Sequence, residues 1–204
     1  MGKDSKKLAS VDTSIVLHTN MRKLCENHSN GMRNILFCLI DDLPGKAEAM
    51  QNLLENRLEI GNSIKPYYGD LIGNIFSEYL RLHIMLSIEA IKAIKKQDHE
   101  IIEAIDKRWK DNADELAIFM SKANPKWNLE DLKIMLGQYV ELSQEQILHR
   151  FARNYEGDVI AYEKLHSALL HISDFVSSGI ALQFPKRFKT DYARKSKFVF
   201  DNFF

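Results

Sequence analysis

Residues 15–45 read IVLHTNMRKLCENHSNGMRNILFCLIDDLPG, and this stretch decides the fold class. Its apolar residues recur every three or four positions, which is the spacing of one face of an α-helix. The members of this face are Leu17, Met21, Leu24, Met32, Ile35 and Leu39. Because residues 11–14 offer N-cap side chains and Pro44-Gly45 ends the pattern, we expect a helix over residues 15–41 with one buried face.

The same helical spacing continues through most of the remaining chain. Further helices are expected at about 46–64, 70–96, 98–122, 129–140 and 144–182. Backbone ahead of a proline disfavours the helical conformation, so the second of the six helices is expected to end before Pro66 and the fourth before Pro125. Ser143 and Gln146 have the spacing of a capping box, which predicts that the longest helix begins there.

These elements predict an all-α protein. Only four prolines and nine glycines occur, and no strand-like alternation stands out. Short connections between long helices favour antiparallel neighbours. We therefore predict an antiparallel up-down helical bundle with a core of four long helices, the first three and the last, and one or two accessory helices. The bundle domain is expected at 15–185, between a polar segment at 1–14 and a tail at 186–204.

The overall charge excludes one large class of partner. Lysine plus arginine number 28 and aspartate plus glutamate also number 28, so no net field draws the chain to nucleic acid. No apolar run approaches the roughly 20 residues of a membrane-spanning helix. The lysine-rich start is not followed by the apolar region of a signal peptide, so we expect a cytoplasmic protein. Cys25 and Cys38 are expected to be reduced and buried.

Polar residues interrupt the apolar face of every long helix. His28 lies at the centre of the first face, and His83 lies opposite the charged side of its own helix. The other interruptions are Arg57, Asn112 and a ladder of Asp158, Tyr162 and His166 at four-residue steps. Burying an unpaired charge costs several kcal/mol, so Asp158 and Arg57 must pair, bind something or reach water. A polar cluster inside the bundle is therefore predicted.

One hypothesis for this cluster is a metal site. Imidazoles and a carboxylate that converge from facing helices are typical ligands of a transition metal in a bundle. The predicted ligands of a single Fe, Mn or Zn ion are His28, His83, His166 and Asp158. A dinuclear site needs two Glu-x-x-His motifs, and only the one that ends at His166 is present. Haem between His28 and His83 is a further alternative.

Two other hypotheses need no metal. A small polar or anionic ligand could be held by Arg57, Asn112, Asp158 and Tyr162. Alternatively, the protein is a non-catalytic structural or interaction module, in which Arg57 pairs with Asp158 and the other polar groups form a hydrogen-bonded network that fixes helix register. The sequence contains no phosphate-binding glycine loop, nucleophile elbow or Cys-x-x-Cys pair, and it identifies no catalytic residue.

The tail at 186–204 differs in composition from the rest of the chain. Its lysines and arginines alternate with aromatic residues, of which Phe188, Tyr192 and Phe198 are examples. Such segments can bind single-stranded nucleic acid or a membrane surface, but more often they dock on protein. We expect this tail to dock on its own bundle or on a second copy, which would form a homodimer.

Four stretches of the chain resemble a small, uncharacterised family of helical proteins from spore-forming bacteria. The stretches are 17–24 (LHTNMRKL), 60–69 (IGNSIKPYYG), 112–115 (NADE) and 121–125 (SKANP). The resemblance covers about residues 17–185, leaves the tail outside, and implies an all-helical fold but no mechanism. Members are sometimes labelled glycosyltransferases, whereas this chain has no nucleotide-sugar fold pattern. Cys25 and Gly31 stand where the family leads us to expect tryptophan, and Arg57 stands where it leads us to expect glutamine.

Overall fold

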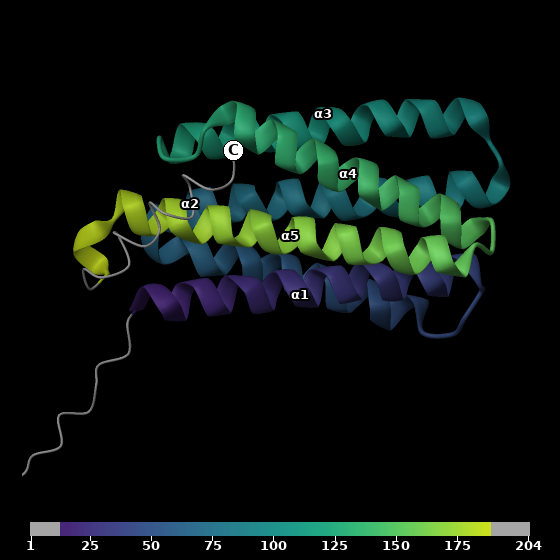
Figure 1. Cartoon of the computed structure of the whole chain (residues 1–204), viewed down its shortest axis with the longest axis horizontal. Helices are drawn as coiled ribbons and strands as arrows, with labels where there is room; N and C mark the ends of the chain where they lie inside the picture. The colour runs from purple at the N-terminus through teal and green to yellow at the C-terminus, as the bar shows by residue number, and fades with distance from the viewer. Residues whose placement is uncertain (1–12, 189–204) are drawn as a thin grey trace, which may run out of the picture.

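The computed structural model describes residues 13–188, and the regular structure in this range is entirely helical. The elements are α1 (Thr13–Ile40), α2 (Lys46–Lys96), α3 (His99–Ala123), α4 (Leu129–Phe151), α5 (Tyr155–Gln183) and a 3-10 turn, η1 (Pro185–Arg187). Each helix packs on the next one in the chain, and α5 returns to pack on α1 (Figure 1). The predicted all-α, up-down bundle is confirmed.

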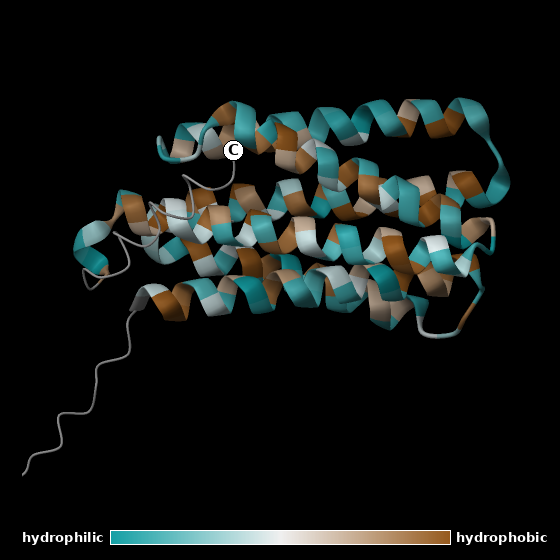
Figure 2. Cartoon of the chain, in the orientation of Figure 1, coloured by the Kyte–Doolittle hydropathy of each residue, from teal (hydrophilic) through white to brown (hydrophobic). Residues whose placement is uncertain are grey.

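The core runs along the whole length of the bundle. Apolar and polar residues are interspersed along every helix (Figure 2), as expected of helices with one buried face and one exposed face. Trp109 and Ile84 are fully buried, and the inward residues of α1, such as Met21 and Ile35, are almost fully buried. Each such side chain contributes roughly 1.5–3 kcal/mol by leaving water. Burial of the predicted apolar faces is therefore the main force that holds the helices together.

Within α2, the chain reverses at one glycine. Residues 46–68 and 70–96 are helical, but Gly69 has φ 82° and ψ 170°, a conformation that only glycine adopts easily. The two halves lie against each other, since Ser77 Oγ donates a hydrogen bond to the carbonyl of Arg57 at 3.3 Å. The expectation of a helix end before Pro66 is wrong, because the helix continues through Pro66 as far as Tyr68. The expected break before residue 70 is present, and it lies at Gly69.

The halves of α2 approach each other closely where both lack a side chain. A Cβ atom on Gly61 would lie 2.6 Å from the carbonyl oxygen of Gly73 and 1.9 Å from Ser77 Oγ. A Cβ atom on Gly73 would lie 2.7 Å from the carbonyl oxygen of Gly61. Backbone cannot give way at such distances, so this glycine pair sets how tightly the hairpin closes.

The boundary between α4 and α5 also differs from the sequence-based expectation. The helix that was expected to end near residue 140 continues to Phe151, and Ser143 lies buried inside it, where its hydroxyl donates to the Tyr139 carbonyl at 2.7 Å. The predicted capping box is therefore wrong. The true start of α5 is capped by Asn154, whose side-chain oxygen accepts from the Gly157 amide at 3.0 Å.

Aromatic rings close the end of the bundle that contains Gly69. Tyr67 stacks on Phe188 with ring centroids 5.7 Å apart, and Tyr68 meets the rings of Trp127 and Phe184. Phe188 is buried there, so the first residues of the predicted tail do dock on their own bundle. Residues 189–204, like residues 1–12, lie outside the described range, and homodimer formation through the tail stays a prediction. Within the described range, no helix combines the length and apolar character needed to cross a membrane.

Candidate functional site: a histidine pair beside an interior cavity

His28 is fixed in the core by an asparagine of α2. Asn56 donates from its side-chain nitrogen to the Leu24 carbonyl at 3.0 Å, so its side-chain oxygen faces His28 at 3.2 Å from Nδ1. An oxygen only accepts, so the proton of the His28 ring lies on Nδ1 and Nε2 is left as an acceptor. Burial lowers the pKa of His28 from 6.5 to about 4, and the Asn56 hydrogen bond partly offsets that effect. His28 is therefore neutral at pH 7.

His83 is held in place through its Nδ1 atom, which accepts a hydrogen bond, whereas Nδ1 of His28 donates one. The indole Nε1–H of Trp109 on α3 donates to His83 Nδ1 at 2.9 Å. Burial, aided by the neighbouring His28, lowers the pKa of His83 to about 3, so this ring is also neutral. Because Nδ1 accepts, the single ring proton lies on Nε2. That Nε2–H is buried, and no group in residues 13–188 accepts a hydrogen bond from it.

The two histidines thus form a complementary pair. Their ring centroids are 6.2 Å apart with the planes tilted by 47°. His28 presents an acceptor at Nε2 and His83 presents a donor at Nε2, but no hydrogen bond joins them. A buried donor without an acceptor costs about 1–3 kcal/mol, which a bound group between the rings could recover.

A small cavity lies beside this pair. It has a volume of about 70 Å³ and is lined by His28, His83, Cys25, Tyr139, Ser173 and ten apolar residues, among them Met21, Phe76, Leu116 and Leu169. Burial raises the pKa of the Cys25 thiol to about 12 and the pKa of Tyr139 above its usual value, so both groups stay protonated. With every lining group neutral, the cavity favours an uncharged occupant over an anion.

Asn112 is a second place where polar atoms lack partners. Its side chain is buried in α3, and neither amide atom finds a hydrogen-bond partner within the described chain. It is not among the residues that line the cavity. The predicted role of Asn112 as a ligand-binding residue therefore stays a prediction, with its burial confirmed.

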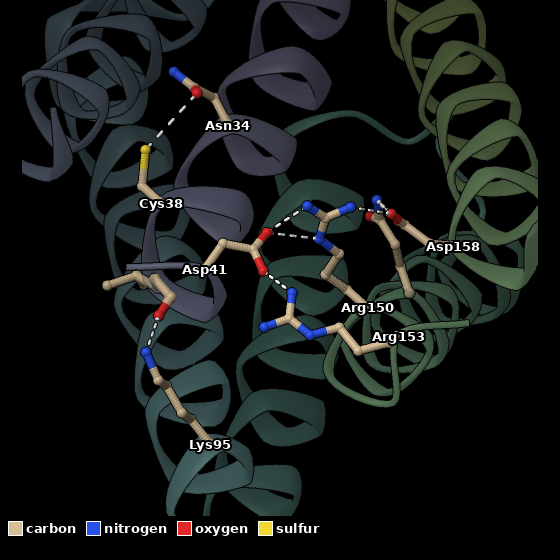
Figure 3. Close-up of polar contacts among 9 residues, drawn as sticks. Asn34, Cys38, Asp41, Lys95, Arg150, Arg153 and Asp158 are labelled. Atoms are coloured by element: carbon tan, nitrogen blue, oxygen red, sulfur yellow. Dashed lines mark hydrogen bonds and ion pairs between the residues drawn. The ribbon is translucent and has the colours of Figure 1, made fainter. Parts of the chain in front are cut away.

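Asp158 belongs to a different region, where four charged residues form what we call the ionic junction: Asp41, Arg150, Arg153 and Asp158 (Figure 3). Asp158 is almost fully buried and accepts from Gln146 at 3.0 Å and from Arg150 at 3.4 Å. Arg150 also donates to Asp41 at the end of α1, and Arg153 donates to the other oxygen of Asp41. The ionic junction thus ties α1, α4 and α5 together.

The electrostatics of the ionic junction balance within the chain. Burial alone would raise the pKa of Asp41, but the hydrogen bonds from Arg150 and Arg153 outweigh it and lower that pKa below 3.8. The Arg150 guanidinium also lies 3.8 Å from the centre of the Phe37 ring. Asp41 and Asp158 share Arg150 as a cationic partner, so neither buried carboxylate requires an ion from outside.

Arg57 does not reach Asp158, and the predicted pairing of these two residues is wrong. Its guanidinium bonds to Glu78 at 3.1 Å and to the Ser77 carbonyl at 3.4 Å, both in the second half of α2. Its Nε is buried and has no partner in the described part of the chain. The reversal at Gly69 brings Glu78 to Arg57, and a helical wheel of separate helices contains no such information.

Tyr162 and His166 lie at the seam between α5 and α1, where both are half-buried. The Tyr162 hydroxyl donates to Asn30 at 2.8 Å, and His166 Nδ1 lies 3.3 Å from the Ser29 hydroxyl. The Arg33 guanidinium lies 4.0 Å from the centre of the Tyr162 ring. Both residues are therefore engaged by α1 and do not line the cavity.

The four predicted metal ligands thus divide among three places. His28 and His83 face each other, His166 lies at the seam, and Asp158 lies in the ionic junction. Among residues 13–188, no group of three or more His, Cys, Asp or Glu side chains is arranged to hold a metal ion. The predicted ligand set is brought together only in its histidine pair.

Several residues of the site were missed from the sequence. Asn56 occupies a position of the apolar face between Leu53 and Ile60, so counting three and four residues along that face would have found it. Trp109 carries a signal of its own, because a buried indole N–H needs an acceptor. Arg150 carried no signal, since it lies near a helix end whose position was wrongly predicted.

Comparisons with known proteins identified no relative of this chain. No family model matches the chain, and neither a curated protein nor a solved structure matches it. The predicted resemblance is confirmed only in its coarser part, which is that the protein is all-helical.

Proposed function

We propose that this protein binds a small uncharged molecule that carries a hydroxyl group on an apolar body. The molecule occupies the cavity beside His28 and His83. The single observation that carries the proposal is the buried Nε2–H of His83, which lacks an acceptor within residues 13–188 although its ring is held firmly by Trp109. A core built only for stability gains nothing from such a group.

The opposite ring tautomers specify the hydroxyl. A hydroxyl group both accepts and donates, so it can accept from His83 Nε2–H and donate to Nε2 of His28. A ketone or ether of the same size satisfies His83 alone. The apolar lining accommodates the rest of the molecule, and the volume of about 70 Å³ limits its size. An apolar cavity of 150 Å³ binds benzene, which has six non-hydrogen atoms, so a molecule of about three to four non-hydrogen atoms suits this one.

The test compares 2-propanol with acetone, which share a carbon skeleton. Two-dimensional NMR of the ¹⁵N-labelled full chain should show saturable shifts of signals from cavity residues with 2-propanol and weaker binding of acetone. One lost hydrogen bond of this kind corresponds to about a three- to tenfold difference in dissociation constant. Equal binding of the two probes, or no saturable shift with either, contradicts the proposal.

A second measurement does not depend on the choice of probe. Long-range ¹H–¹⁵N spectra of the imidazole rings report which nitrogen bears the proton. We expect Nδ1–H for His28 and Nε2–H for His83, unchanged in the control variant His99→Gln, which alters an exposed histidine at the start of α3. The same tautomer in both rings would overturn the proposal, since the pair would no longer be complementary.

The metal hypothesis makes a separate prediction at the same residues. Purified protein would carry about one equivalent of Fe, Mn or Zn, and the double variant His28→Ala, His83→Ala would lose it. Elemental analysis decides between the two versions. A metal content that depends on both histidines would replace the proposed hydroxyl ligand with an ion.

The second candidate is the non-catalytic structural or interaction module. The observation in its favour is that Asp158 and Arg57, the two charges expected to pair, bind something or reach water, are each paired inside the chain. If this module is the whole function, substitutions at His28 and His83 change stability alone and no probe binds.

A further inference from the structure

A second pocket lies on the surface between α1 and the first half of α2. It has a volume of about 340 Å³, within the range of small-molecule sites. Its lining is unusually rich in asparagine, and we call it the asparagine groove: Asn27, Asn30, Gly31, Asn34, Ala49, Asn52, Glu55, Asn56 and Glu59. None of the predicted site residues lines it.

A glycine lets the two helices of the asparagine groove approach each other, and exposed asparagines line its sides. Gly31 lets α1 approach α2 beneath the groove, because a Cβ atom there would lie 2.9 Å from Leu53 Cδ2. On the walls, Asn27 and Asn34 project from α1 and Asn52 projects from α2, and all three are exposed. The helical spacing of these residues therefore aligns their amides along both sides of the groove.

Two of these five amides are not used by the fold. Asn56 holds His28, Asn30 accepts from the Tyr162 hydroxyl, and Asn34 accepts from the Cys38 thiol at 3.9 Å. Within residues 13–188, Asn27 and Asn52 form no hydrogen bond with another side chain or with backbone outside their helices. Each of these two side chains therefore offers one acceptor oxygen and two donor hydrogens to a ligand.

The chemistry of the groove favours one class of ligand. The exposed asparagines supply both donors and acceptors, Glu55 and Glu59 supply acceptors, and no lysine or arginine lines the groove. An anion would meet two carboxylates without a cation to offset them. A cation would use the oxygens but leave the amide hydrogens without acceptors. A molecule with several hydroxyl groups uses both kinds of group at once.

We propose that the asparagine groove binds a polyhydroxylated, uncharged molecule, such as a sugar or a linear polyol. This site is distinct from the cavity beside the histidine pair and does not depend on the function proposed for that cavity. The two sites share only Asn56, whose side chain borders the groove and supports His28.

Titration of the ¹⁵N-labelled full chain with sorbitol and with glucose tests this proposal. The asparagine side-chain amides give separate NMR signals, so the groups that would bind can be observed directly. We expect the signals of Asn27, Asn30, Asn34 and Asn52 to shift saturably with at least one of the two probes. The signal of Asn74, which is exposed on the other half of α2, should not shift.

The double variant Asn27→Ala, Asn52→Ala tests the role of the amides. Both residues are exposed and alanine favours helix, so the fold is retained. Losing two neutral hydrogen bonds should weaken binding about tenfold. The matched control Asn74→Ala should leave binding unchanged. Shifts that never saturate, equal weakening in the control, or binding of putrescine but of neither polyol would each overturn the proposal.

Discussion

The ionic junction and the histidine pair are both polar regions in an apolar core, but they differ in how far their atoms are satisfied. In the ionic junction, the Asp41 and Asp158 carboxylates are bonded to arginines of the same chain. In the histidine pair, the Nε2–H of His83 has no acceptor in the described residues. The charged groups are thus paired within the chain, whereas the neutral ring of His83 carries the donor that lacks an acceptor within residues 13–188.

This difference separates two uses of buried polarity. A paired network restricts which helix ends can meet, and it loses stability when any member is removed. An unpaired neutral donor costs about 1–3 kcal/mol of stability, and it is available to a ligand. Substitutions in the two regions should therefore have opposite consequences for stability and for binding.

The largest effect is expected from Arg150→Met. This change leaves Asp158 buried with Gln146 as its remaining partner, and it removes one of the two arginines that contact Asp41. Breaking a buried pair by removing one partner should lower the free energy of unfolding by about 3–5 kcal/mol. Urea unfolding measures this loss.

The matched control for that change is Arg153→Met. The Arg153 side chain is 55% exposed, and Asp41 keeps its bonds to Arg150 when Arg153 is lost. We expect a much smaller loss than in Arg150→Met, because an exposed ion pair contributes little to stability. Similar losses in the two variants would mean that the ionic junction is no stronger than a surface ion pair, and the contrast with the histidine pair would fail.

A smaller effect is expected from acid. His28 and His83 have lowered pKa values in the folded protein, about 4 and about 3, so below pH 6.5 the unfolded chain binds protons that the folded chain does not. Stability is therefore full above pH 6.5 and falls as the pH is lowered. Each histidine should cost about 2 kcal/mol between pH 6.5 and pH 5.

Urea unfolding at pH 7, 6 and 5 gives this slope. His28→Leu should remove about half of the slope, whatever its effect at pH 7. His99→Gln, which alters an exposed histidine, should leave the slope unchanged. A slope that persists in His28→Leu would show that this ring already exchanges protons with solvent, and the description of a neutral buried pair would need revision.

The smallest effect is expected from Asn112→Leu. Leucine has nearly the shape of asparagine, and both amide atoms of Asn112 lack partners in the described structure. The free energy of unfolding should stay the same or rise by up to about 1 kcal/mol. Thermal unfolding detects a change of this size.

Asn56→Leu is the comparison, because Asn56 is equally buried but bonds to His28 and to the Leu24 carbonyl. Removing it leaves the buried Nδ1–H of His28 without an acceptor and should lower stability by about 1–3 kcal/mol. If Asn112→Leu is as harmful as Asn56→Leu, Asn112 has a partner such as bound water or a ligand, and it belongs with the histidine pair.

The sequence predicted the fold class and the burial of the two histidines because both depend on helical spacing alone. His28 and His83 interrupt regular apolar faces, and a face that packs inward carries its polar members with it. The same reasoning could have found Asn56. It could not have found the partner of Trp109, since the meeting of α2 and α3 depends on how long helices align.

The errors arose where the chain changes direction. Pro66 predicted a helix end, yet the contacts of Tyr67 and Tyr68 with aromatic rings from elsewhere in the bundle hold the helix through that point. Ser143 and Gln146 have the spacing of a cap, but both are buried inside α4. Local signals of helix ends compete with tertiary packing, and here packing prevailed. Arg150 and Asp41 meet where α4 and α1 end. Because the end of α4 was wrongly predicted, the sequence did not predict their pairing.

The reversal at Gly69 makes the bundle formed by one chain depend on a single backbone conformation. If residues 46–96 ran straight as one α-helix, they would rise roughly 75 Å, far beyond the length of the other helices. The second half of α2 could then meet α1 and the first half only by crossing into a second molecule, as in domain exchange. A side chain at residue 69 disfavours the reversal, so a one-residue change there shifts the protein toward interlocked dimers.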